Sequence, residues 1–230
     1  MTVTSTQLAD LESIRAFVEE FDRSEGSDAR SELLIRAHAR RKAIVDTARA
    51  RAVGRLLEEV VPSRRRRHEL VVALGDDGVG AVIAAAEQGD PVAAIALASG
   101  APSGREFALE LAHLLHPEDV PLWAPWTWSP GEETGAFALM VHDPGALVGA
   151  DDAATLDRLQ EVCRYVAAVC HAAGLGVNET DPLSFDVLAA AVWATYAVTV
   201  VRLRMTKEFS QLLPPAVGFA ERVLGLRRQA

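Results

Sequence analysis

Glu110, His113 and His116 come closest, in residue type and spacing, to a reactive or metal-binding set. Glu110 and His113 form a Glu-x-x-His pair, which on a helix places a carboxylate and an imidazole on one face, as di-iron helical bundles require. Such sites need a second pair of this kind, and the sequence contains none. His113 and His116 could chelate one metal with Glu110 or His142, but a hydrogen-bonded pair at a helix C-terminus is the more ordinary arrangement. The sequence therefore predicts no metal site.

The chain continues from these histidines into a segment rich in tryptophan and proline. Residues 113–130 hold four of the eleven prolines and three of the four tryptophans, Trp123, Trp126 and Trp128. Proline fixes φ and removes a backbone donor, while tryptophan has a large apolar face and one N–H that needs a partner. The composition predicts a rigid loop that forms an aromatic surface or the rim of a pocket. The alternative is that the tryptophans fill the core.

Several catalytic motifs are absent from the sequence. The glycines of Gly75-x-x-Gly78-x-Gly80 reverse the order of the dinucleotide fingerprint and place Asp76 and Asp77 where a phosphate would lie. There is no Gly-x-x-x-x-Gly-Lys-Ser/Thr loop, no Gly-x-Ser-x-Gly elbow and no cysteine-protease signature around either cysteine. The sequence leaves enzymatic activity undecided and assigns no cofactor.

Charge is distributed unevenly along the chain. The net charge is −9, but residues 1–68 carry 14 Lys and Arg against 11 Asp and Glu, whereas residues 69–230 carry 9 against 21. The basic residues gather on a predicted helix and the run that follows it: Arg36, Arg40, Arg41, Arg49, Arg51, Arg55 and Arg64 to Arg67. This part of the chain is the expected docking site for an anionic group. The alternative, and the commoner meaning of such charges, is a solvated helix face. The acidic remainder and the lack of interleaved aromatic residues disfavour nucleic acid as a partner.

Helical periodicity dominates the chain. We expect a first helix capped by Thr4 or Ser5 and running to about Arg23, and one long helix or two between Ser31 and Val61. Further helices are expected at about 103–116, 151–174, 187–201 and 215–228, whereas 135–141 fits either a strand or a helical turn.

The predicted fold is all-α, a mostly helical bundle with a Trp/Pro-rich loop. The alternative is an α+β or α/β fold with a small sheet around residues 69–100, because Leu-Val-Val-Ala-Leu before the glycines could form a strand. We expect residues 1–230 to form a single helical domain, with residues 1–61 as an N-terminal helical hairpin subregion.

The apolar segment 187–201 resembles a membrane span with a basic flank at Arg202 and Arg204. Fifteen helical residues cover only about 22 Å of the roughly 30 Å hydrocarbon core, and Asp186 blocks extension, so a buried central helix is expected.

The start of the chain does not resemble a secretory signal, which predicts a cytoplasmic location. Lysine occurs only at positions 42 and 207, beside abundant arginine and alanine, which is typical of a GC-rich, bacterial source. Cys163 and Cys170 would lie roughly 10 Å apart on one helix, too far for a disulfide.

Two functions from different classes fit these observations. The first is a non-enzymatic protein-interaction protein, an adaptor or regulatory component, whose contact is the aromatic loop 121–130 or the Arg-rich helix, because Trp and Arg are enriched at interface hot spots. The second is a small-molecule- or metal-binding enzyme with a pocket in the 110–143 region, where Glu110 would orient His113 as a general base and His142 and Asp143 would approach. We expect a protein partner, with a small molecule as the alternative, and neither nucleic acid nor membrane.

Overall fold

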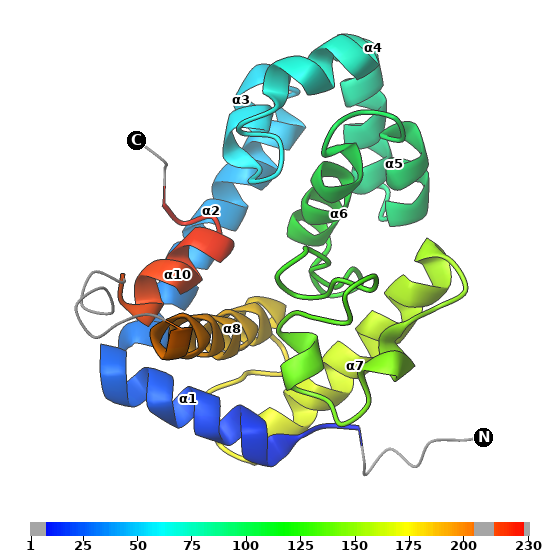
Figure 1. Ribbon diagram of the computed structural model, residues 1–230. Coiled ribbons are helices and arrows are strands. Elements are labelled where there is room, and N and C mark those ends of the chain that lie inside the picture. The colour runs from blue at the N-terminus through cyan, green and yellow to red at the C-terminus, as the bar shows by residue number, and fades with distance from the viewer. Residues whose placement is uncertain (1–7, 205–213, 228–230) are drawn as a thin grey trace. The chain divides into compact units, whose positions relative to one another are not determined.

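The fold is seen in a computed structural model that describes residues 8–204 and 214–227 (Figure 1). In this part of the chain there are nine α-helices and no strand, and 67% of the residues are helical. The predicted all-α fold is confirmed. The alternative with a sheet around residues 69–100 is wrong, because that segment forms α4 (Arg67–Glu87) and α5 (Pro91–Leu97).

The chain divides into two compact units, each assembled from separate stretches of sequence. Unit 1 comprises Met1–Ala37, Pro125–Val148 and Glu161–Ala230, and unit 2 comprises His38–Ala124 and Gly149–Gln160. Helices α2 (Ala29–Arg49) and α7 (Asp152–Ala172) contribute residues to both units. The segment 31–61 contains two helices, because α2 is followed by the short helix α3 (Val53–Glu59).

The core of unit 1 surrounds α8 (Pro182–Arg204), against which α1 (Leu11–Glu25) and α10 (Ala216–Val223) pack (Figure 1). Buried residues occur on all sides of α8 from Leu183 to Val198, as expected for a helix with neighbours all round it. By length and composition alone α8 could cross a membrane, but 67% of its most apolar stretch is buried within the structure, which favours a core helix.

Helix α1 begins later than the sequence indicated. Its N-cap is Asp10, whose side chain accepts hydrogen bonds from the Ser13 backbone N–H at 3.0 Å and the Ser13 hydroxyl at 2.7 Å. Thr4 and Ser5, the predicted caps, lie outside the described residues. A side-chain acceptor at this position satisfies N–H groups that have no partner within the first turn.

The undecided segment 135–141 contains the 3-10 helix η2 (Phe137–Leu139). Gly135 precedes it with φ +123°, and a Cβ there would lie 2.5 Å from the carbonyl oxygen of Thr127, so only glycine fits this close approach. The backbone N–H groups of Ala136 and Phe137 donate to the carbonyls of Trp126 and Thr127 at 2.8 and 3.0 Å. These bonds connect the second half of the Trp/Pro-rich loop to the start of η2 within unit 1.

The core of unit 2 is formed by α4, α5 and α6 (Gly104–Leu115), which pack on one another, with α3 packed on α4. Ile44 and Ala48 of α2 contribute to the same cluster of buried residues. Gly75, with φ +68° and ψ +167°, kinks α4, so the glycine segment interrupts a helix instead of joining a strand to one.

Candidate functional site

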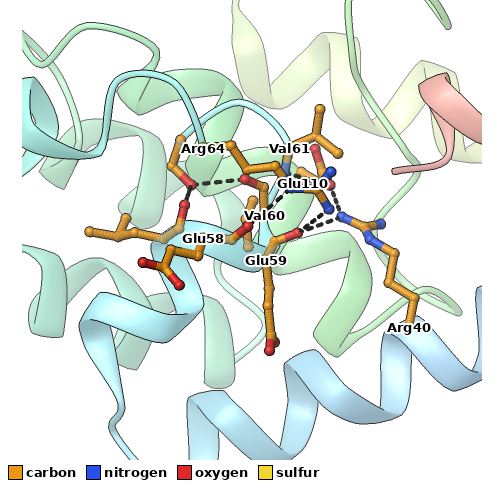
Figure 2. Close-up of polar contacts among 9 residues, drawn as sticks. Arg40, Glu58, Glu59, Val60, Val61, Arg64 and Glu110 are labelled. Atoms are coloured by element: carbon orange, nitrogen blue, oxygen red, sulfur yellow. Dashed lines mark hydrogen bonds and ion pairs between the residues drawn. The ribbon is translucent and has the colours of Figure 1, made fainter. Parts of the chain in front are cut away.

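Glu110 lies inside unit 2, where it forms an ion pair with Arg40. Its carboxylate accepts from the Arg40 guanidinium and, at 3.3 Å, from the backbone N–H of Val61. The same Arg40 nitrogen donates to the carbonyl of Glu59 at 3.3 Å, and only 15% of the Arg40 side chain and 9% of the Glu110 side chain are exposed. Figure 2 shows Arg40 reaching from α2 to both groups. This buried pair connects α2, the end of α3 and α6.

Two further arginines of the basic cluster bind the C-terminal ends of helices. Arg64 donates to the carbonyls of Glu58 and Glu59 at 3.1 and 2.8 Å, as Figure 2 shows at the end of α3. Arg41 donates to the carbonyls of Leu114 and Leu115, the last residues of α6, at 2.9 and 3.2 Å. The last carbonyls of a helix have no partner within it, and cations are favoured there. Arg40, Arg41 and Arg64 therefore serve the fold of unit 2.

The two predicted histidines hold backbone segments in place. His113 is buried and its Nδ1 donates to the carbonyl of Val120 at 2.8 Å, while the Nε2 of His116 donates to the carbonyl of Glu87 at 2.9 Å. Because a carbonyl only accepts, each bond sets which ring nitrogen carries hydrogen. In residues 8–204 and 214–227, no three or more His, Cys, Asp or Glu side chains are grouped so that they could hold a metal ion.

His142 and Asp143 belong to unit 1. His142 is exposed and its Nδ1 lies 3.9 Å from the carboxylate of Asp10, and the Asp143 carboxylate accepts from the backbone N–H of Gly145 at 3.0 Å. Each of the two is thus accounted for by its own local contact.

Two of the three loop tryptophans are core residues. Trp123 is 3% exposed and belongs to unit 2, where the guanidinium of Arg105 lies 4.1 Å from the centre of its ring. Trp128 is 1% exposed and belongs to unit 1, in which Trp126 is half-buried against the core. The placement agrees with the alternative in which tryptophans fill the interior.

Neither cysteine is suited to act as a nucleophile. Both thiols are free, so the prediction that they form no disulfide is confirmed. Burial raises the pKa of the Cys170 thiol to about 11, and burial together with the charge of Asp186 holds the pKa of Cys163 well above its ordinary value. The thiolate is the reactive form, and a raised pKa favours the protonated thiol near neutral pH.

A groove of about 410 Å³ lies on the second half of α2 and the start of α3, within unit 2. Its floor consists of the buried Thr47 and four alanines, Ala39, Ala43, Ala50 and Ala52, and its rim carries the exposed residues Lys42, Asp46 and Arg55. Sequence reasoning identified the basic residues of this region but not the alanines. The available signal was the spacing of Ala39, Ala43 and Ala50, which fall on one face of a helix.

Comparison with known proteins identifies no relative: no family model matches the chain, and no curated protein or solved structure matches it significantly. The candidate site therefore depends on the geometry of this chain alone.

Proposed function

We propose that this chain is a non-enzymatic protein-interaction protein, an adaptor or regulatory component, that binds an acidic helical segment of a partner. The observation that carries the proposal is the alanine-floored groove with a basic rim on α2 and α3. The proposal keeps the Arg-rich helix as the contact. It does not use Trp123 or Trp128, because their side chains are buried.

The floor of the groove suits a helix. Helices pack at interaxial distances of about 8–10 Å, and the shortest distances require small side chains at the contact. Ala39 and Ala50 are exposed and Ala43 is half-buried, so the floor is accessible. The alanines of this floor present only methyl groups to a bound helix, and Thr47, which also lines the groove, is buried.

The charge around the groove favours an acidic partner. Residues 38–67 carry ten Lys and Arg against three Asp and Glu, and two of the ten, Lys42 and Arg55, line the groove, where they pair with Asp46 and Glu59. The rim ion pair Lys42–Asp46 is 79% and 57% exposed, and exposed pairs contribute little to stability. Lys42 can therefore exchange Asp46 for a partner carboxylate at small cost.

The rest of unit 2 argues against nucleic acid as the occupant. Residues 68–124 and 149–160 carry two Lys and Arg against twelve Asp and Glu. A long polyanion would extend over this acidic surface and be repelled by it. A single acidic helix would contact only the groove and its rim. Complementary charge of this kind accelerates association and selects the partner.

The test is site-specific photo-crosslinking in the protein's own host. A photoreactive residue replaces Ala43 in the groove or, as the matched control, the exposed Ala73 of α4. We expect one adduct at position 43 and none at 73, with the cross-link on an acidic helical segment of the partner. A synthetic peptide of that segment should then bind the purified chain. Equal adducts at both positions, or an adduct of nucleic acid, would contradict the proposal.

A charge-reversal pair tests the rim. Lys42→Glu with Arg55→Glu should abolish peptide binding, whereas Arg15→Glu with Arg202→Glu makes the same change in net charge at exposed sites outside the groove and should have little effect. If both double variants lose binding equally, attraction by net charge explains it and the groove does not.

A further inference from the structure

Unit 2 also contains a pocket of about 270 Å³ that shares no lining residue with the groove. Three segments line it: the turn between α4 and α5, the chain just after α6, and the first turns of α7. Its apolar wall includes Pro91, Val92, Val120, Pro121 and Leu156. The volume is just below the roughly 300 Å³ at which pockets for drug-sized ligands begin, so a ligand must be small.

Hydrogen bonds and an ion pair fix the walls of this pocket. The Nε2 of His116 donates to the carbonyl of Glu87, just before the α4–α5 turn. The side-chain amide of Gln160 donates to the carbonyl of Glu118 at 2.8 Å, and the Arg105 guanidinium binds the carboxylate of Asp152 at 2.9 and 3.2 Å. These bonds connect the first turns of α7 to α6 and to the chain after it. A pocket with fixed walls binds without a large ordering cost.

The charged groups that line the pocket are both carboxylates, which accept hydrogen bonds. Asp119 and Asp157 line it, and no Lys or Arg does. Asp157 is exposed and forms no ion pair with the part of the chain that the structure describes. The Nε2 of Gln160 is used by Glu118, which leaves Oε1 as the acceptor of that amide. A carboxylate and an amide oxygen beside an apolar wall are suited to an ammonium group on an apolar body.

We propose that this pocket is a binding site for a small organic cation, a primary ammonium carried on a short apolar or aromatic group. Asp157 binds the ammonium, and the wall formed by Val92, Val120 and Leu156 contacts the apolar part. The site overlaps the 110–143 segment only at residues 119–121, and Glu110, His113 and His116 do not line it.

The experiment is an NMR titration of the full-length, nitrogen-15-labelled chain with benzylamine, and with benzyl alcohol as the neutral match. Benzylamine should cause saturable shifts of the backbone amides of Val92, Val120 and Ala153, and benzyl alcohol should bind at least fivefold more weakly. Asp157→Asn should weaken benzylamine about fivefold, the upper end for a partly exposed ion pair, and should leave benzyl alcohol unchanged.

Two variants complete the test. Asp76→Asn makes the same change in charge at an exposed position of α4 outside the pocket and should leave benzylamine affinity unchanged. Ala153→Leu fills the pocket from the exposed side of α7 and should weaken both ligands. The proposal fails if the benzylamine shifts do not saturate or if benzyl alcohol binds equally well. It also fails if Asp157→Asn, like Asp76→Asn, leaves the affinity for benzylamine unchanged.

Discussion

The core of unit 1 surrounds an apolar helix, α8, whereas unit 2 uses the charged side chains of Arg40 and Arg41 to connect its helices. In unit 1, ten of the thirteen buried residues of α8 are aliphatic, aromatic or alanine, and the other three are Ser184, Asp186 and Thr195. In unit 2 the Arg40–Glu110 pair lies largely out of water, and Arg41 binds the carbonyls at the end of α6. Both units have an apolar core, and unit 2 adds to its core an ion pair that is more deeply buried than the Arg30–Asp22 pair of unit 1.

Five basic residues of unit 2 fall into two groups, those that bond to backbone or buried groups and those exposed at the groove. Apolar burial is non-directional, so any side chain of suitable size and polarity contributes to it. A buried guanidinium is stable only when specific acceptors surround it. Arg40, Arg41 and Arg64 donate to such acceptors, whereas Lys42 and Arg55 lie exposed on the rim of the groove in ion pairs with Asp46 and Glu59. Only the exposed members are available to a partner.

Glu110→Ala should have the largest effect on stability, because it leaves the guanidinium of Arg40 buried without its carboxylate. Removing one partner of a buried pair costs about 3–5 kcal/mol. Urea denaturation would measure the loss, and hydrogen exchange should place it mainly in α3 and α6. The double variant Arg40→Met with Glu110→Leu should recover most of the stability. A loss below about 1 kcal/mol in the single variant would mean that the pair does not hold unit 2 together.

Leu183→Ala should weaken unit 1 by about 2–4 kcal/mol, because it opens a cavity beside α8 in the apolar core. Hydrogen exchange should increase in α1, α8 and α10, which pack on one another. Leu183→Met, which nearly conserves volume, should cost less than about 1.5 kcal/mol. If the two substitutions cost the same, packing at this position is not the source of stability.

Asp10→Ala should cost about 1 kcal/mol at neutral pH through loss of the α1 cap. The backbone hydrogen bond from Ser13 lowers the pKa of Asp10 and outweighs burial, with smaller lowering effects from the Ser13 hydroxyl and the charge of His142. A carboxyl whose pKa is lowered on folding stabilises the protein above its unfolded-state pKa, and this contribution is lost as the pH falls through the folded-state value.

The free energy of unfolding of wild type and Asp10→Ala should therefore differ at pH 7 and converge in strong acid. Asp10→Asn retains a side-chain acceptor without a charge and serves as the control for the cap itself. A difference between wild type and Asp10→Ala that does not change with pH would show that the carboxylate charge at this cap has no influence on folding.

Ala39→Trp should have the smallest effect on folding, a change in unfolding free energy within about 0.5 kcal/mol, because Ala39 is exposed in the groove. It should nevertheless block the cross-link at position 43 by filling the floor. The matched substitution Ala37→Trp, at a buried alanine two residues earlier, should cost about 1–3 kcal/mol through overpacking. Thermal unfolding of both variants distinguishes an open surface from a packed one.

The all-α class could be predicted because helical periodicity is a local property. The apolar residues Leu156, Leu159, Val166 and Cys170 are buried along α7, as their spacing of three, seven and four residues predicts for one face of a helix. The local ambiguity at Gly75 was harder to resolve, because a glycine between two apolar stretches fits a turn after a strand as well as a kink in a helix. In unit 2, α4 packs against α3, α5 and α6, and in this setting Gly75 forms a kink within the helix.

The candidate residues show the limit of sequence reasoning. Glu110 and Arg40 are 70 positions apart, and no local pattern indicates that they meet. A Glu-x-x-His spacing describes one helix face, but it does not show that the carboxylate faces an arginine while the imidazole of His113 binds the carbonyl of Val120. The composition of the Trp/Pro-rich loop likewise fits a surface or a core equally well, and burial of Trp123 and Trp128 is a tertiary outcome.

The helical segments, the separation of Cys163 and Cys170 and the uneven charge could be read from the sequence. Each depends on residues that are close together along the chain. Tertiary structure alone decided which arginines are buried, where the alanines of α2 form a groove and which carboxylates surround a pocket. The physical reason is that burial and ion pairing depend on distances between segments far apart in the chain, and these distances exist only once the helices have packed.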